Sequence, residues 1–161
     1  MRASASLDWT PEQRVRELSD NALSYPVGTT YQYSNVNYAT LALIVETVSG
    51  QPFESYVQEH IFNPLEMSQS TYYDPNAIPP DSAAGYQQWF GFPVASYRPL
   101  PRSGNGAGGL IASAEDMTHF MIAQLNEGRY ANVTVLSPAG IAEMHTPAIR
   151  DCNTEEFYAM V

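Results

Sequence analysis

The sequence is divided by strong helix-boundary signals, and these limit the fold to a set of short helices. Thr10-Pro11-Glu12-Gln13 combines an N-cap, a proline at the first helical position and a glutamine at N3, which predicts a helix over about 11–23. Ser34 or Asn35 can cap a second helix over about 36–49, and Gly50 can end it in a left-handed conformation. Its predicted buried stripe is formed by Leu41, Ile44, Val45 and Val48.

Three more helices are predicted further along the chain. One covers about 52–62 and stops at Asn63-Pro64, and another starts at Ser113 and closes at Gly128. The last is short and runs from Ser137-Pro138 toward Met144. Residues 68–101 read as loops and short strands. We therefore expect residues 1–161 to form a single domain, mainly α with short β segments.

The composition is that of a globular protein and argues against two kinds of partner. Seventeen acidic and seven basic residues give a formal net charge of −10, and all seven basic residues are arginine. Such a chain repels phosphate backbones and anionic membranes, so nucleic acid is not an expected partner. The single cysteine, Cys152, excludes an internal disulfide framework and a cysteine-based zinc site. No metal and no organic cofactor is indicated.

A glycine-rich run, Gly104-Asn105-Gly106-Ala107-Gly108-Gly109, satisfies the pattern G-x-G-x-x-G. A dinucleotide site needs that pattern directly between a strand and a helix. Here a proline-rich loop precedes the run, and Leu110-Ile111-Ala112 separates it from the next helix. A tight loop in which glycine lets the backbone pack closely is the favoured interpretation.

The sequence gives little support for a histidine that binds a metal or acts as a catalytic base. His60, His119 and His145 lie far apart, without H-E-x-x-H spacing, and the sequence has no G-x-S-x-G segment. A triad assembled across the fold stays possible on spacing alone. We expect the three histidines to be exposed or structurally hydrogen-bonded.

The segment Tyr33-Ser34-Asn35 becomes informative through its surroundings. Pro26-x-Gly28 followed by Tyr31-x-Tyr33-Ser34-Asn35-x-x-Tyr38 resembles the second active-site motif of class C β-lactamases and their esterase and DD-peptidase relatives. A capping role for Ser34 or Asn35 would explain the tripeptide alone.

Further segments resemble the same family and follow in the family's order. They are 43–53, Ile61-Phe62-x-Pro64-Leu65-x-Met67, Ala84-Gly85-Tyr86 and 106–117. One departure stands out, because Glu66 occupies the position where the family has glycine. The resemblance covers roughly residues 26–144, and it implies the helical part of the α+β serine β-lactamase/DD-peptidase-like fold.

The resemblance implies acyl transfer to a serine from a β-lactam, a D-Ala-D-Ala peptide or an ester. In that family the serine lies in an S-x-x-K motif, and the lysine helps to activate it. Tyr33 would relay a proton between this serine and the leaving group, and Asn35 would orient the acyl side chain of the substrate and that lysine. A free tyrosine ionises near pH 10, so it needs nearby positive charge to act as a base at neutral pH. These two residues are the candidate catalytic residues.

The nucleophile motif S-x-x-K and the K-T-G strand cannot be present, because the chain has no lysine. His145-Thr146-Pro147 does not replace H-T-G, since proline takes the place of glycine and the segment closes a helix. We therefore expect the central part of a longer enzyme, truncated at both ends and inactive alone. The alternative is a non-catalytic relative used for peptide or cell-wall binding, or for assembly.

The expected partner of the intact protein is a small-molecule or peptide acyl substrate. The isolated chain is also expected to self-associate through the face that truncation exposes, or to be marginally stable. The resemblance implies that the parent protein is extracytoplasmic or membrane-tethered. The residues of this chain do not by themselves indicate a cellular compartment. The aromatic segment 72–97 could form a wall that selects bulky acyl groups or could pack onto the helices.

Overall fold

The structure is a computed structural model that describes residues 10–16, 18, 22, 24–96, 102–150 and 157–158. Its helical elements are α1 (Pro11–Arg16), α2 (Asn35–Ser49), α3 (Phe53–Val57), the π-helix η2 (Gln58–Phe62), the 3₁₀-helix η3 (Arg102–Ala107), α4 (Ala114–Leu125) and α5 (Pro138–His145). The strands are β1 (Thr71–Tyr72), β2 (Tyr86–Trp89), β3 (Phe92–Ala95), β4 (Leu110–Ile111), β5 (Arg129–Tyr130), β6 (Val133–Thr134), β7 (Ile149–Arg150) and β8 (Phe157–Tyr158).

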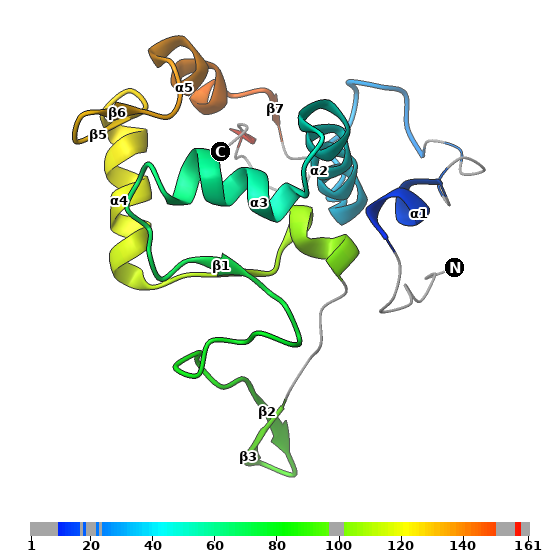
Figure 1. Ribbon diagram of the computed structural model, residues 1–161. Helices are drawn as coiled ribbons and strands as arrows, with labels where there is room; N and C mark the ends of the chain where they lie inside the picture. Colours follow the sequence, from blue (N-terminus) through cyan, green and yellow to red (C-terminus); the bar gives the residue numbers. More distant parts are fainter. Residues whose placement is uncertain are drawn as a thin grey trace.

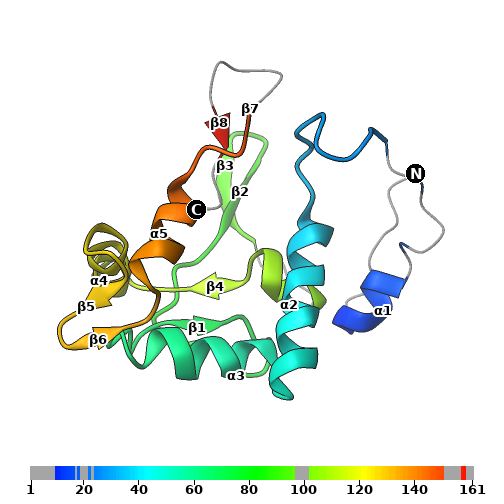
Figure 2. The same ribbon diagram turned by 90° about the horizontal axis from the view of Figure 1, so that it is seen from above.

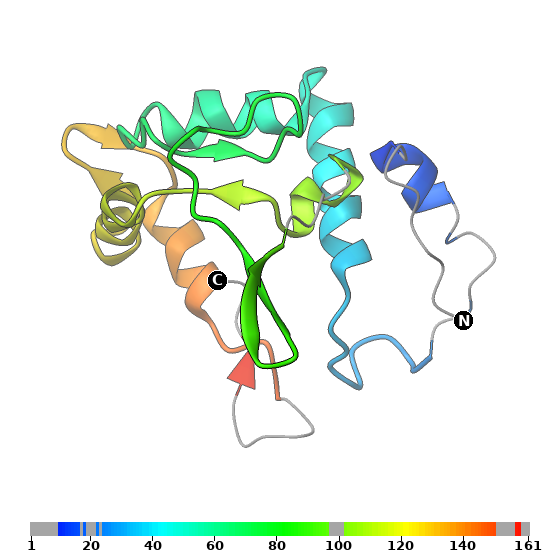
Figure 3. The ribbon, with the colours of Figure 1, turned by 90° about the horizontal axis from the view of Figure 1, so that it is seen from below.

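Within the described ranges, every strand belongs to a two-stranded sheet, and helices make up most of the regular structure. The antiparallel pairs are β1–β4, β2–β3, β5–β6 and β7–β8. Helices α1 and α2 lie on one side of the molecule, and α4 with α5 lies on the other (Figures 1 and 2). Helix α3 and the β1–β4 pair lie between these two groups, which the view from below also shows (Figure 3). The prediction of a mainly α fold with short β segments is confirmed.

Helix α1 is shorter than predicted. Gln13 N donates to Thr10 Oγ1 and Thr10 N donates to Gln13 Oε1, so the expected capping box forms. Helix α1 covers Pro11–Arg16 and buries no residue, Leu18 is in a 3₁₀ conformation, and Ala22 lies outside any helix. Local signals start a helix, but packing of an apolar face is what prolongs it. Residues 17, 19–21 and 23 of the predicted helix lie outside the described residues.

Helix α2 has the predicted boundaries, but its buried side differs from the predicted one. Leu41, Ile44 and Val48 are 56%, 52% and 83% exposed, whereas Ala39 and Ala42 are 1% and 4% exposed. Helix η3 packs directly against α2, and its Gly106 lies against Ala42. Val45, the fourth residue of the predicted stripe, is half-buried, so the prediction is wrong for Leu41, Ile44 and Val48. Gly50 ends the helix with φ +73°, as expected.

The third predicted helix is present to its last residue, but it changes type. After α3 the chain forms the π-turns of η2, in which Asn63 N donates to Gln58 O at 2.9 Å. The start of α3 is fixed by a neighbouring helix, because Phe53 N donates to Glu46 Oε1 of α2 at 3.0 Å. This bond joins α2 and α3 directly.

Helices α4 and α5 begin where the sequence predicted. Ser113 Oγ accepts a hydrogen bond from Asp116 N, and Ser137 Oγ accepts one from Gly140 N. Helix α5 ends at His145, and Thr146 caps it. The segment 145–147 thus closes a helix, as predicted.

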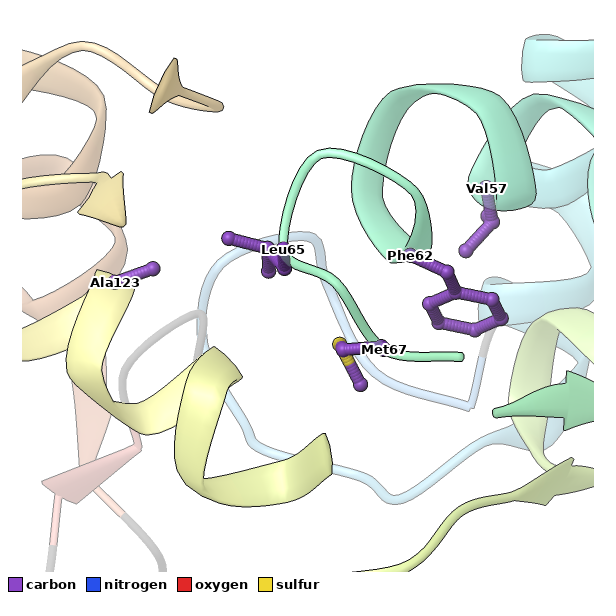
Figure 4. Packing of buried hydrophobic residues seen from close by; sticks show 5 residues of the cluster. All are labelled: Val57, Phe62, Leu65, Met67 and Ala123. Carbon is purple, nitrogen blue, oxygen red and sulfur yellow. The ribbon is translucent and has the colours of Figure 1, made fainter. Parts of the chain in front are cut away.

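The hydrophobic core lies where the end of η2, the following loop and α4 meet (Figure 4). Its buried residues are Val57, Phe62, Leu65, Met67 and Ala123, and Leu65 is fully buried. Tyr72 packs at its margin, with its ring 5.3 Å from that of Phe53 and 6.0 Å from that of Phe62. The F-x-P-L-x-M segment therefore supplies the centre of the core.

The aromatic segment divides into two parts with different surroundings. Tyr72 and Tyr73 join the body of the protein, and Tyr73 is buried. The β2–β3 hairpin instead projects from the rest of the molecule (Figure 1), and Trp89, Phe90 and Phe92 are exposed. The alternative that the whole segment packs onto the helices is therefore wrong for β2 and β3. Tyr97 lies outside the described residues.

Candidate functional site: the Tyr33–Asn35 pair

A tight turn leads the chain toward the candidate site. Thr29 N and Thr29 Oγ1 both donate to Pro26 O, at 3.3 and 2.7 Å. Gly28 has φ +76°, a conformation that glycine adopts at no steric cost. The chain then runs extended to Ser34, whose φ of −150° and ψ of 110° place it as the N-cap of α2. Ser34 caps by backbone conformation, because its side chain makes no capping hydrogen bond.

The structure brings the two predicted site residues together. Tyr33 Oη donates to Asn35 Oδ1 at 2.7 Å. Tyr33 is 69% exposed and Asn35 is exposed as well, so both groups face solvent. The pair stands at the N-terminal end of a 15-residue helix whose first turn has no acidic residue. That end of a helix carries partial positive charge and favours anionic groups. The arrangement offers a hydroxyl, an amide and a positive helix end at one exposed place.

The glycine run packs against the same helix, as the sequence favoured. A Cβ built on Gly106 would lie 2.5 Å from Ala42 Cβ and 2.6 Å from the carbonyl oxygen of Tyr38. No side chain fits at that distance. The run continues into β4, and α4 begins only at Ala114. It therefore lacks the strand–glycine–helix order of a dinucleotide site.

Each histidine has a structural contact. His119 Nδ1 lies 2.9 Å from Leu65 O, and His145 Nε2 lies 3.1 Å from Gln124 Oε1. The ring of His60 packs on that of Tyr56 at 4.3 Å. These contacts agree with the structural role that we expected.

The described part of the chain contains neither a candidate metal site nor a candidate membrane-spanning helix. Within the described ranges, no three His, Cys, Asp or Glu side chains gather in a way that could hold a metal ion. No helix in the same part of the chain is long and apolar enough to cross a bilayer.

A family model described as Beta-lactamase matches residues 1–154. The chain belongs to the beta-lactamase family. The fold and the order of motifs agree with this membership, so the predicted resemblance is confirmed.

Beta-lactamase-family relatives match most of this chain but only part of their own length. The chain is 31% identical over 122 residues to the putative penicillin-binding protein PbpX of Bacillus subtilis, which covers 76% of the chain and 31% of that protein. The octameric penicillin-binding protein homologue from Pyrococcus abyssi has a TM-score of 0.78 and 27% identity, over 94% of the chain and 34% of its own. A D-stereospecific amidohydrolase from Streptomyces sp. shares the fold, with a TM-score of 0.77 and 24% identity, over 95% of the chain and 44% of its own. The chain thus spans about a third of the length of PbpX.

Sequence reasoning proposed Tyr33 and Asn35 as candidate residues but gave no role to the groups that pack and bond around them. It described the glycine run only as a tight loop and did not connect it with α2. It also gave no role to Glu46 and Glu54, which bond to α3 and η3. The Asn105–Glu54 bond joins residues 51 positions apart, and the Glu46–Phe53 bond joins two different helices across seven positions, so no capping or helical pattern reveals either.

Proposed function

We propose that these residues form part of a serine hydrolase that cleaves an amide or ester bond through an acyl-serine intermediate. The observation that carries the proposal is the Tyr33 Oη–Asn35 Oδ1 contact at the start of α2, in a chain of the beta-lactamase family. A binding protein needs neither the hydroxyl nor the amide in this arrangement. A β-lactam, a D-Ala-D-Ala peptide and a simple ester all contain the acyl group that such a site attacks.

Tyr33 and Asn35 have different roles in this proposal. Tyr33 takes the proton of the attacking serine and returns it to the leaving group, which is general base and then general acid catalysis. Asn35 orients the acyl side chain of the substrate through its amide. Tyr33 needs a neighbouring cation to work near neutral pH. The exposure of the pair leaves room for such a group to approach from another part of the protein.

The proposal places the nucleophile outside this chain. The chain has no lysine, so neither S-x-x-K nor K-T-G can occur in it. On this account the 161-residue chain does not turn over substrate, whereas the longer gene product that carries it does.

Covalent labelling tests this assignment. The chain and the full-length product are treated with a fluorescent penicillin and with a fluorophosphonate, and intact mass reports the adduct. Labelling of the full-length product alone supports the proposal. Labelling of the chain itself would show a reactive serine within residues 1–161 and contradict it. If neither protein reacts, a non-catalytic relative that binds peptide or cell-wall material is the better account.

We also propose that the isolated chain self-associates through the exposed side of α2. Leu41, Ile44 and Val48 lie at helical spacing, and each is more than half exposed. Contiguous apolar surface of this kind favours association. The penicillin-binding protein homologue from Pyrococcus abyssi is octameric, which supports the idea only by analogy.

Light scattering tests the association. A variant with Leu41→Gln, Ile44→Gln and Val48→Gln is expected to be monomeric at a protein concentration where the original chain is not. Glutamine keeps the helix propensity, and Met121→Gln with Leu125→Gln on exposed α4 positions is the matched control. An original chain that is monomeric at every concentration tested would refute self-association.

A further inference from the structure

The contact between η3 and α2 is closer than any side chain at position 106 permits. A Cβ on Gly106 would approach Ala42 Cβ to 2.5 Å and the carbonyl oxygen of Tyr38 to 2.6 Å. Both distances are below 3.0 Å, which real Cβ atoms essentially never show. One neighbour is backbone, so it can only yield if the helix itself moves. Glycine at 106 therefore sets how closely the two elements approach.

This contact lies on the side of α2 where the candidate site begins. Asn35, Tyr38 and Ala42 follow one another at spacings of three and four, which places them on one side of a helix. Asn35 is thus one turn away from the Gly106 contact. Because Tyr33 is hydrogen-bonded to Asn35, a shift of α2 at this contact would move both groups.

The η3 turn is itself fixed from the opposite side. Asn105 is 4% exposed, and its Nδ2 donates to Glu54 Oε1 of α3 at 2.7 Å. Its Oδ1 lies so close to Gly109 that a Cβ there would approach it to 2.5 Å. Helix α3 is joined in turn to α2, because Phe53 N donates to Glu46 Oε1. The three elements α2, α3 and η3 therefore form a closed set of contacts.

We propose that Gly106 and Asn105 are positioning residues for the acyl-transfer site. Gly106 sets the distance between η3 and α2, and Asn105 holds η3 against α3. Together they fix where Tyr33 and Asn35 stand relative to the rest of the active site. This inference rests on the proposed function, because it assigns a task to residues that support the same site.

The test is the acylation kinetics of the full-length product with a fluorescent penicillin. Gly106→Ala is compared with Gly108→Ala, because a Cβ on Gly108 would meet nothing within 4 Å. For Gly106→Ala we expect the limiting acylation rate constant to fall about 10- to 100-fold, since an error of about 1 Å in position costs that much. The half-saturating penicillin concentration and the fraction of protein that is labelled should change little. Gly108→Ala should behave like the original protein.

The same kinetics separate positioning from a loss of folded protein. If Gly106→Ala lowers only the labelled fraction and leaves the limiting rate constant unchanged, Gly106 has a merely structural role and the proposal is overturned. Ala42→Gly added to Gly106→Ala removes one of the two close contacts, so it should restore part of the rate. Ala42→Gly alone is the reference that corrects for the destabilisation that glycine causes in a helix interior. A rate in the double variant above that of Gly106→Ala supports the proposal, and a rate below it would contradict the assignment of the loss to this contact.

A second measurement tests the positioning role of Gly106 without relying on acylation, so it can fail independently of the proposed function. If the original full-length product reacts with neither the fluorescent penicillin nor the fluorophosphonate, the proposed function fails, and amide hydrogen exchange then tests the positioning claim. Faster exchange over residues 35–39 in Gly106→Ala than in Gly108→Ala supports it. Equal exchange in the two variants overturns it.

Discussion

At the scale of single residues, Glu66 shows a local conformation at odds with its side chain. Its φ of +56° lies in the left-handed region, where a side chain costs energy and glycine does not. The motif order in the sequence had already placed Glu66 where the resembling family has glycine. The structure supplies the physical reason for that preference.

Glu66→Gly is expected to stabilise the protein by about 0.5–1 kcal/mol, because it removes the left-handed strain. Glu59→Gly is the matched control, since Glu59 is an exposed acidic residue in a helical conformation. That control should lose about 1 kcal/mol. The free energies of unfolding come from urea denaturation, and a loss of stability in both variants would contradict the assignment of strain to Glu66.

Tyr72 gives a pH dependence at the same scale. Burial raises the pKa of the Tyr72 hydroxyl above its ordinary value, and the charge of Glu54 raises it further. An unfolded tyrosine ionises near pH 10, so the folded protein holds this proton more tightly. The resulting stability is present below about pH 10 and is lost as pH rises through the folded pKa. Tyr72→Phe should therefore flatten the fall in melting temperature above pH 10. Exposed Tyr86→Phe should not, and identical profiles for the two variants would contradict the claim.

At the scale of elements, Asp116 connects the loop before β1 to the start of α4 through buried hydrogen bonds. It is 2% exposed and accepts hydrogen bonds from Gln69 N at 2.8 Å and from Ser70 Oγ at 2.7 Å. Asp116→Ala leaves both donors without this acceptor, so we expect a loss of about 2–4 kcal/mol in the free energy of unfolding. Glu115→Ala, at the exposed neighbouring position, should cost less than about 1 kcal/mol. Equal losses in urea denaturation would show that the buried bonds do not matter.

The elements also show what local sequence can predict. The starts of α1, α4 and α5 were predictable, because a cap is formed by residues three positions apart. The buried side of α2 was not, because hydrophobicity alone favoured Leu41, Ile44 and Val48. What packs against Ala42 instead is η3, a partner about 60 residues away in sequence. The change from α3 to a π-helix likewise has no local signal that the capping rules describe.

At the scale of the whole molecule, family membership accounts for the fold better than periodicity does. The order of the motifs predicted the helical part of the beta-lactamase fold, and the family match over residues 1–154 confirms it. The candidate pair could be proposed from the sequence alone, since Tyr33 and Asn35 lie two positions apart. Its support could not, because Asn105 and Glu54 meet through a hydrogen bond that spans 51 positions. Local sequence indicates the candidate residues, and long-range packing determines where they lie.

The measurement that tests the central claim most directly is the acylation rate of the full-length product carrying Tyr33→Phe. Phenylalanine removes only the Tyr33 hydroxyl, which donates a hydrogen bond to Asn35 Oδ1. The control is Tyr25→Phe, because Tyr25 is also an exposed tyrosine. We predict that Tyr33→Phe lowers the limiting rate constant for acylation by a fluorescent penicillin by about 10²- to 10⁴-fold, the range for loss of general acid–base catalysis. Tyr25→Phe should leave that rate constant unchanged. Acylation of Tyr33→Phe at the original rate would contradict the assignment of Tyr33 to the reaction.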